Sequence, residues 1–193
     1  KGGNVSPIPA DHSQNLTGIW PKKVVNYKTV MSDAASGFTS VTYPFPVIRM
    51  ADLYLMYAEA LNEKGEDYAT VLPWIDMVRE RSGLQGVKES WDQYVGNSKY
   101  ATQTGLRQII MQERRIELAF EGHYFWDVRR WKTATTELTQ PLTGWKVRYG
   151  ETDVDYYSEN LVLVRDFTPK MYFWPIDIGE LRKDPNLVQN YGW

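Results

Sequence analysis

The chain has 193 residues, with 22 Lys or Arg against 24 Asp or Glu and a formal net charge of -2. This length favours one domain, or a large part of one, that can bury a core without covalent cross-links. The balanced charge argues against a broad positive surface for nucleic acid or anionic membrane. Because the chain contains no Cys, disulfide bonds, thiol nucleophiles and cysteine-ligated zinc are excluded.

No stretch of the sequence is long and apolar enough to cross a membrane. The longest apolar stretch, 50–61, contains Asp52 and Glu59 and is shorter than the roughly 20 residues that a spanning helix needs. The first residues, 1–4, show no initiator Met, no signal-peptide pattern and no lipid-acceptor Cys. We therefore expect that processing or truncation has removed the natural beginning.

The chain begins with a loop-rich segment and continues into a helix. Residues 1–46 are rich in Gly, Pro, Ser, Asn and Asp without a sustained helical period, which predicts an irregular, loop-rich initial segment. The apolar period that follows predicts a helix over 47–63. Apolar residues occupy two of its faces, and a narrow stripe including Asp52 and Glu63 is polar. We therefore expect this helix to be packed on two sides.

A second helix is predicted over 67–82, after Gly65 ends the first. Pro73 lies inside it and removes one backbone hydrogen bond, which costs about 3 kcal/mol unless the helix kinks or restarts there. The hairpin is similar to a tetratricopeptide-type unit, whose helix pairs stack on neighbouring pairs. Since one clear pair is present and such arrays need roughly three, we expect further pairs in sequence outside this chain.

The rest of the chain alternates predicted loops and helices. Segment 83–101 predicts a polar loop with several aromatic residues, and further helices are predicted over 104–121 and 123–133. Segment 142–193 is less regular. Short strands are predicted at 146–149, 161–165 and 171–174. The predicted fold class is mainly α, with tetratricopeptide-like helix pairs, loop-rich extensions and a few short strands.

The densest group of charged residues spans the third and fourth predicted helices. It consists of Glu113, Arg114, Arg115, Glu117, Glu121, Asp127, Arg129 and Arg130. In one interpretation, two carboxylates about 5 to 9.5 Å apart flank a sugar in a cleft and hydrolyse it. In the other, helical spacing places Glu113 on the inward face, where an Arg from the same segment neutralises it. We favour this structural ion-pair network, because structural ion pairs are commoner than functional ones.

Motifs for catalysis and cofactors are absent from the sequence. It contains no nucleophile elbow, phosphate-binding Gly loop, dinucleotide fingerprint or zincin motif. His12 and His123 are the two His residues, and neither has a second imidazole nearby in the sequence. The acidic segment 151–159 lacks the Gly turn of an EF-hand loop, so we interpret it as a solvated loop. We expect no catalysis, no metal site and no cofactor.

Aromatic residues are unusually frequent, with 8 Trp and 13 Tyr, many of them outside the predicted helices. A flat indole or phenol ring can stack on the C–H face of a sugar while polar neighbours bind its hydroxyls. The more common alternative is that each ring fills a small core beneath its loop. The candidates for glycan contact are Trp20, Trp91, Tyr94, Trp145, Tyr156 and Tyr157.

Three stretches of the chain carry a specific resemblance. The first runs YPFPVIRMADLYLMYAEALNE over 43–63 and continues with VRERSGL over 78–84. The second runs ERRIELAFEGHYFWDVRRW over 113–131. The third comprises WPID and DPNLVQNYGW within 174–193. In order and spacing these stretches resemble the C-terminal part of the SusD/RagB family, the surface glycan-binding lipoproteins of Bacteroidetes outer membranes.

The resemblance implies that 47–193 is the C-terminal region of a SusD-like fold, with tetratricopeptide-like pairs. It implies a non-catalytic protein that captures oligosaccharides or other nutrients and delivers them to a SusC-like, TonB-dependent transporter. It also implies a place on the extracellular face of the outer membrane, through a lipid anchor absent from this chain. The family's sugar contacts mostly precede the matched stretches, so the resemblance assigns no ligand residue. Two alternatives stay open: a helical-repeat adaptor for a protein or peptide and, less favoured, a glycoside hydrolase.

Overall fold

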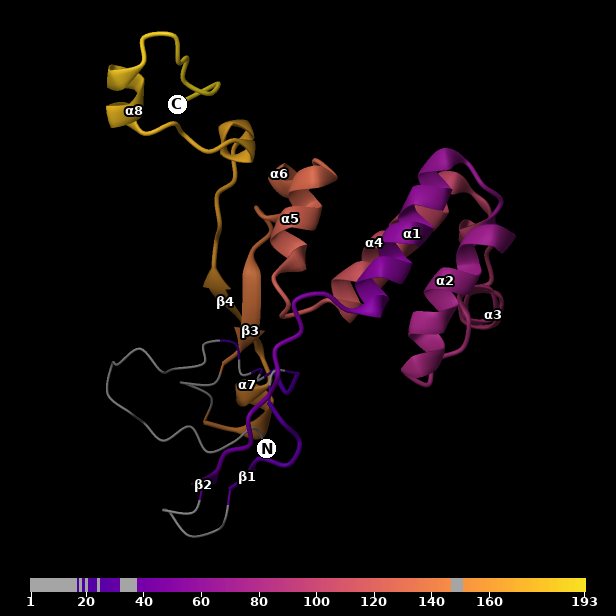
Figure 1. The fold of residues 1–193 in the computed structure, drawn as a ribbon. Coiled ribbons are helices and arrows are strands. Elements are labelled where there is room, and N and C mark those ends of the chain that lie inside the picture. The colour runs from indigo at the N-terminus through magenta and orange to yellow at the C-terminus, as the bar shows by residue number, and fades with distance from the viewer. Residues whose placement is uncertain (1–16, 18, 20, 24, 32–37, 147–150) are drawn as a thin grey trace. The chain divides into compact units, whose positions relative to one another are not determined.

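The computed structural model describes residues 17, 19, 21–23, 25–31, 38–146 and 151–193. Helices dominate these residues, together with two antiparallel sheets of two strands each (Figure 1). The mainly α fold class predicted from the sequence is therefore confirmed. The chain divides into two compact units: the helical unit, Lys22–Tyr124, and the C-terminal unit, which combines Lys1–Pro21 with Phe125–Trp193.

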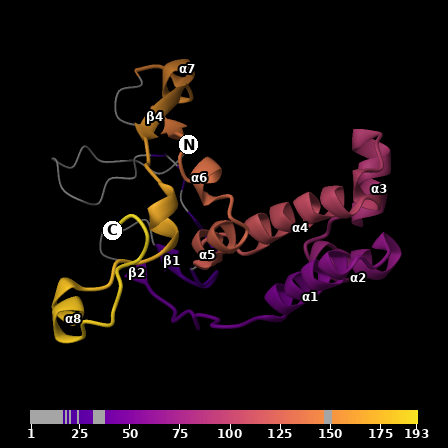
Figure 2. The ribbon, with the colours of Figure 1, turned by 90° about the horizontal axis from the view of Figure 1, so that it is seen from above.

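The helical unit is built around two long helices joined by a short turn and a third that packs beside them. Its elements are β1 (Val30–Met31), β2 (Phe38–Thr39), α1 (Met50–Lys64), α2 (Tyr68–Arg81), α3 (Val87–Ser90), the π-helical turn η1 (Trp91–Val95), the 3-10 turn η2 (Lys99–Ala101) and α4 (Gln103–Glu117). Strands β1 and β2 pair antiparallel, with Val30 opposite Thr39. Helix α1 lies beside both α2 and α4, as the two ribbon views show (Figures 1 and 2).

Local signals in the sequence set the turn between α1 and α2. Gly65 adopts a left-handed φ of 87°, and its N–H donates to the carbonyl of Asn62 at 3.0 Å. The side chain of Asp67 then accepts a hydrogen bond from the backbone N–H of Ala69 at 2.8 Å and begins α2. Helix α2 runs through Pro73 without ending.

The first and third predicted helices differ from the structure at one end. The first begins at Met50 rather than at 47, because Arg49 is extended, with φ -139° and ψ 154°. The third ends at Glu117 rather than at 121, because Phe120 adopts a left-handed φ of 65° that a helix cannot contain.

The predicted loop over 83–101 is wrong for much of its length, because α3, η1 and η2 lie within it. Each of these elements is only one or two turns long, which is too short to produce a helical period in the sequence. Val87 and Tyr100 anchor the segment to the core and are 0% and 5% exposed. The Tyr100 hydroxyl donates to the carboxylate of Asp92 at 2.8 Å.

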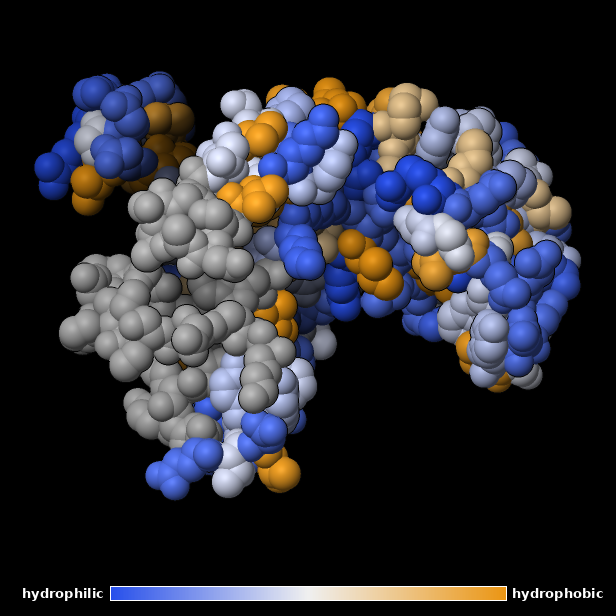
Figure 3. Space-filling model, turned by 90° about the horizontal axis from the view of Figure 1, so that it is seen from below, coloured by the Kyte–Doolittle hydropathy of each residue, from blue (hydrophilic) through white to orange (hydrophobic). Residues whose placement is uncertain are grey.

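The core of the helical unit lies between α1, α2 and α4. Its most deeply buried apolar residues are Leu55, Ala58, Val71, Ile75, Val87, Leu106 and Ile110. Helix α1 packs against both α2 and α4, as expected for a helix packed on two sides. Its residues Met50, Leu53 and Met56 remain 43–56% exposed within the described residues. On the face drawn in Figure 3, hydrophobic residues are likewise scattered among hydrophilic ones.

The C-terminal unit consists of short elements. They are α5 (His123–Arg130), which begins at the end of the helical unit, α6 (Ala134–Glu137), β3 (Leu142–Trp145), α7 (Asp153–Tyr156), β4 (Glu159–Leu163), the 3-10 turn η3 (Pro169–Tyr172) and α8 (Ile178–Lys183). Strands β3 and β4 pair antiparallel, with Trp145 opposite Glu159. Helix α5 ends three residues before the predicted end at 133, because Lys132 adopts a left-handed φ of 59°.

The predicted strands agree with the structure in part. The strand predicted over 161–165 overlaps β4, whereas all but the first residue of 146–149 lies outside the described residues. The strand predicted over 171–174 is wrong, because the turn η3 occupies its first half. Pro169 begins that turn, and the fixed φ of a proline suits a helical first position.

Two polar contacts join α1 to α4. Asp52 and Arg114 are 7% and 3% exposed, and Nη1 of Arg114 donates to Oδ1 of Asp52 at 2.8 Å. Asn62 and Gln103 exchange hydrogen bonds through side-chain amides and backbone carbonyls, at 3.1 and 2.7 Å. Since an uncompensated buried charge is strongly destabilising, Asp52 and Arg114 depend on each other.

We expect Asp52→Ala to lower the free energy of unfolding by about 3–5 kcal/mol, because it leaves the Arg114 guanidinium buried without this carboxylate. Urea unfolding followed by circular dichroism measures the change. Glu180→Ala is the control, since it breaks the exposed Lys183–Glu180 pair and should leave the midpoint nearly unchanged. An Asp52→Ala protein as stable as the parent would show that this pair does not hold α1 to α4.

Candidate functional site

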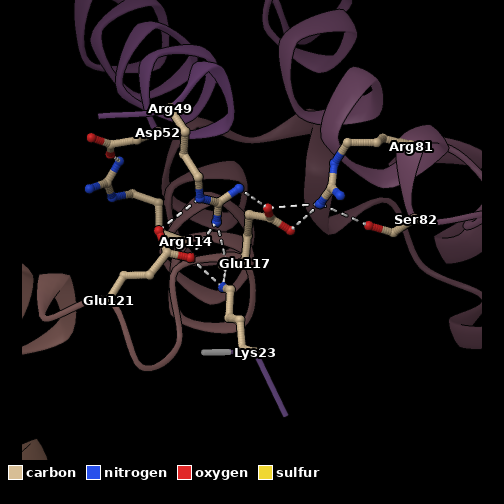
Figure 4. Close-up of polar contacts among 8 residues, drawn as sticks. All are labelled: Lys23, Arg49, Asp52, Arg81, Ser82, Arg114, Glu117 and Glu121. Carbon is tan, nitrogen blue, oxygen red and sulfur yellow. Dashed lines mark hydrogen bonds and ion pairs between the residues drawn. The ribbon is translucent and has the colours of Figure 1, made fainter. Parts of the chain in front are cut away.

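Charged side chains from separate segments converge in the helical unit at the ends of its long helices (Figure 4). This ionic cluster consists of Lys23, Arg49, Arg81, Glu117 and Glu121. Arg49 donates hydrogen bonds to both carboxylate oxygens of Glu121, from Nε to Oε2 at 2.7 Å and from Nη2 to Oε1 at 2.8 Å. Arg49 also pairs with Glu117, whose two oxygens lie 2.8 and 3.0 Å from Nη2 of Arg81. Lys23 pairs with Glu121 and completes the cluster.

The turn after α4 determines where Glu121 lies. Its neighbours Phe120 and Gly122 both adopt left-handed φ values, 65° and 83°. A positive φ is uncommon for any residue other than Gly and unusual for an aromatic one. The chain therefore reverses, the backbone N–H of Glu121 donates to the carbonyl of Leu118 at 3.1 Å, and the Glu121 carboxylate meets Arg49 at the start of α1.

Hydrogen bonds within the ionic cluster favour the charged forms of its members. Burial opposes the charge of Glu121, but the hydrogen bonds from Arg49 and Lys23 outweigh it and lower the pKa of this carboxyl. Burial likewise opposes the charge of Arg49, and its bonds to Glu121 and Glu117 raise its pKa above the ordinary value. The Glu121 carboxylate is therefore held as an acceptor rather than prepared as a proton donor.

Glu113 is buried, at 8% exposed, but its partner is not the expected Arg from the same segment. Arg79 of α2 pairs with it instead. The reason is that successive side chains of α4 lie on different sides of the helix. Arg114 faces Asp52 on α1. Arg115 is exposed, with its guanidinium 5.2 Å from the ring centre of Tyr124. Burial is the largest influence on Glu113 and raises its pKa, against the opposing effect of Arg79.

Glu113 also borders a cavity of about 360 Å³, which Trp91, Lys99, Gln108, Ile109 and Gln112 line with it. Among the described residues that line this cavity, Glu113 is the one carboxylate. Hydrolysis of a glycosidic bond ordinarily needs two carboxyl groups on opposite sides of that bond. The cavity therefore offers the aromatic and amide groups of a binding site more readily than the pair of acids of a hydrolase.

The charged residues of α5 lie in the C-terminal unit and have separate partners. Asp127 is 4% exposed and accepts a hydrogen bond from Nε of Arg130 at 2.8 Å. Arg129 donates from Nη2 to the backbone carbonyl of Tyr172 at 2.6 Å. The eight residues predicted as one network are thus divided between the two units, and Arg129 has a carbonyl partner in place of a carboxylate partner among the described residues.

The structure brings three of the candidate aromatic residues together. Trp145 at the end of β3 meets Tyr157 edge to face, with ring centres 5.1 Å apart, and Tyr157 meets Tyr156 at 5.0 Å. We call these three residues the aromatic cluster. Trp145 and Tyr157 are 38% and 50% exposed. An ion pair between Lys146 and Asp155, at 2.8 Å, joins β3 to α7 beside the cluster and lowers the pKa of Asp155.

The other candidates lie elsewhere. Trp91 and Tyr94 are both in η1 of the helical unit, where Trp91 packs partly against the core and Tyr94 is 72% exposed. The ammonium of Lys99 lies 5.5 Å from the ring centre of Trp91. Trp20 lies outside the described residues.

A further cavity of about 710 Å³ in the C-terminal unit was not predicted from the sequence. Its lining, which we call the aromatic–basic pocket, consists of Trp126, Arg129, Arg130, Lys132, Tyr172 and Phe173. The alternation of Trp and Arg in WDVRRW over 126–131 is a sequence signal for this pocket, although the same arginines also fit the predicted ion-pair network. The contribution of residues 172–173, some forty positions further along the chain, has no local sequence signal.

No helix among the described residues is long and apolar enough to cross a membrane. No group of three or more His, Asp or Glu residues in this part of the chain is arranged to hold a metal ion.

The lowered pKa of Glu121 predicts a pH-dependent effect of Glu121→Gln. At pH 7 we expect a loss of about 2 kcal/mol in unfolding free energy, since charge-assisted bonds to Arg49 and Lys23 are lost. Because the folded pKa is depressed, this contribution exists above the ordinary Glu pKa of about 4.3 and disappears as the pH falls through the lower folded value. The melting temperatures of Glu121→Gln and the parent should therefore approach each other as the pH is lowered from 7. The control Glu80→Gln changes an exposed residue and should melt like the parent at every pH. A difference in melting temperature for Glu121→Gln that stays constant with pH would contradict the prediction.

The chain is similar to known proteins over most of its length. The sequence model that describes the SusD family matches residues 3–193 of the chain. SusD-like protein P2 of Formosa agariphila is 37% identical over 133 residues, covering 68% of this chain and 26% of that protein. SusD-like protein P25 of the same organism is 39% identical over 144 residues, covering 75% and 23%.

Solved structures agree with these sequence matches. A SusD-like protein from Bacteroides fragilis aligns with a TM-score of 0.63 and 29% identity, covering 84% of this chain and 28% of that one. A SusD-like carbohydrate binding protein from the same organism aligns with a TM-score of 0.59 and 31% identity, covering 75% and 28%. The chain spans about a quarter of the length of the relatives it matches. The matched residues and the shared fold together establish that this chain belongs to the SusD family.

Proposed function

We propose that this chain is part of a non-catalytic protein that binds oligosaccharides on the extracellular face of the outer membrane. In this proposal the protein is held there by a lipid anchor outside the chain and delivers its ligand to a SusC-like, TonB-dependent transporter. Membership of the SusD family supports the proposal, and one relative is described as a carbohydrate binding protein.

The observation that carries the proposal is the aromatic cluster. Trp145 and Tyr157 hold each other edge to face, and both remain more than a third exposed. Rings fixed in this way lose little conformational freedom when a sugar stacks on them. The nearby Lys146–Asp155 pair offers charged donors and acceptors for sugar hydroxyls.

The backbone around Trp145 supports a rigid platform. The backbone N–H of Trp145 donates to the carbonyl of Thr17 at 3.0 Å, and that of Lys146 donates to Tyr156 at 3.0 Å. Gly144 lies so close to Thr17 that an added Cβ would come within 2.6 Å of its Cα. This close approach requires Gly and fixes the strand that presents Trp145.

The engaged carboxylates support a binding function rather than hydrolysis. Glu113, Glu117 and Glu121 each face an Arg. A glycosidase needs one carboxyl group free to donate a proton and another free to attack or to activate water.

We expect Trp145→Ala to weaken binding of a neutral oligosaccharide by about tenfold, which corresponds to about 1.4 kcal/mol. Isothermal titration calorimetry with a panel of neutral oligosaccharides measures the affinities. Tyr157→Ala should act in the same direction, whereas Tyr191→Ala, which removes a tyrosine that is 83% exposed outside the cluster, should not.

If both Trp145→Ala and Tyr157→Ala bind oligosaccharides like the parent, the aromatic cluster does not contact the ligand. Absence of binding to every glycan, together with tight binding to a peptide library member, would overturn the proposal in favour of the adaptor. Release of shorter sugars during incubation with an oligosaccharide would favour the hydrolase.

A further inference from the structure

We propose that the aromatic–basic pocket of the C-terminal unit binds an acidic sugar unit, a ring that carries a carboxylate or a sulfate group. The inference rests on the proposed function in taking the ligand to be a saccharide. It goes further by placing a second site away from the aromatic cluster and by assigning a charge to the sugar.

The pocket combines flat apolar walls with positive charge. Of the six described residues that line its volume of about 710 Å³, three are aromatic and three are basic. Trp126 and Phe173 are each 58% exposed, so their rings are accessible to a ligand. Rings of this kind stack on the C–H face of a sugar, and cavities of roughly 300–1,000 Å³ are typical of small-molecule sites.

Arg129 is held in place without being neutralised. Its guanidinium lies 4.9 Å from the ring centre of Phe125 and 5.6 Å from those of Phe167 and Trp174. One of its five N–H groups donates to the carbonyl of Tyr172 at 2.6 Å. Neither the rings nor the carbonyl carries a net charge, so the positive charge of Arg129 stays available to an anion. The planar fork of donors suits carboxylate and sulfate oxygens.

Lys132 adds a second charge from an unusual backbone position. Its N–H donates to Arg129 at 3.1 Å and the N–H of Thr133 donates to Val128 at 2.9 Å, which is the bonding pattern of a Schellman motif at the end of α5. The left-handed residue of that motif is usually Gly, yet here it is Lys132, with φ 59°. A Lys at a position that favours Gly has a conformational cost, and its side chain lines the pocket.

The charge of the pocket distinguishes acidic from neutral ligands. Arg130 is paired with Asp127 at 2.8 Å, so its charge is largely balanced. In the part of the chain that the structure describes, neither Arg129 nor Lys132 forms an ion pair with a carboxylate. Two basic side chains beside exposed rings therefore match a ligand with one or two negative groups on an apolar-faced ring.

The test compares sugars that differ only in charge, using the chain of residues 1–193 and calorimetry at low salt. One pair is an oligogalacturonate and the corresponding neutral galactose oligomer; the other is a sulfated galactan oligosaccharide and its desulfated form. We expect at least tenfold tighter binding of the acidic member, and a preference that shrinks as salt is added. The two pairs separate a carboxylate ligand from a sulfate ligand.

Lys132→Gly is the decisive variant, because it removes the charge while relieving the left-handed backbone. It should melt at the same temperature as the parent or higher, and should lose several-fold affinity for the acidic sugar only. Lys22→Ala, which removes an exposed lysine of the helical unit, is the charge-matched control and should bind like the parent. Trp126→Ala should weaken binding of the acidic sugar, whereas Trp145→Ala should leave the preference for acidic sugars intact.

Equal affinity for the acidic and neutral members of both pairs would overturn the inference, and so would unchanged binding in Lys132→Gly. If these variants and sugars show no preference for acidic sugars, but neutral sugars bind and Trp145→Ala abolishes that binding, the proposed function is supported and only the acidic-sugar site is contradicted. If no sugar of either kind binds, both the proposed function and the acidic-sugar site are contradicted.

Discussion

Pairing between guanidinium and carboxylate groups on different helices is the interaction on which the helical unit depends. Arg114 meets Asp52 across α4 and α1, and Arg79 meets Glu113 across α2 and α4. These side chains are largely removed from water, so loss of one member takes from the other a carboxylate or guanidinium that balances a buried charge. The pairs therefore join α4 to both of the other long helices, α1 and α2.

The same pairing limits where ligand chemistry can occur. The Glu121 carboxylate is held by Arg49, and the hydrogen bonds it accepts lower its pKa and favour its charged form. We propose that the binding groups lie outside the paired helices, in the rings at the end of β3 and around η3, which short and irregular segments present. Rigid scaffolds with variable, ligand-contacting segments are common in binding proteins.

Sequence periodicity predicted the long helices because their apolar residues recur over many turns, and Gly65 marked a real helix end. Periodicity did not predict the helix ends that are set by the backbone conformation of single residues. Phe120 and Lys132 adopt left-handed conformations that residue type does not suggest, so two helices were predicted too long. The turns of 87–101 are too short to produce a period.

The candidate site was harder to predict than the fold, because the partner of each side chain depends on the tertiary structure and not on spacing in the sequence. Helical spacing predicted that Glu113 is buried beside an Arg of its own segment, but its partner in space is Arg79 of α2. Likewise, six aromatic residues were equivalent in the sequence, and the structure gathers only three of them, Trp145, Tyr156 and Tyr157, among the described residues. The resemblance to a family identified the scaffold but assigned no ligand contact.

Arg114 and Arg129 show how environment gives one residue type two roles within a single matched stretch. Arg114 is 3% exposed and faces the carboxylate of Asp52, so its charge is used to join two helices. Arg129 is surrounded by rings and a carbonyl, which orient a guanidinium through its faces and one edge but do not cancel its charge. Charge that is oriented and not cancelled attracts an anion, whereas a paired charge does not. In our proposal, the difference between scaffold and binding site therefore follows from what surrounds each guanidinium rather than from the motif that contains it.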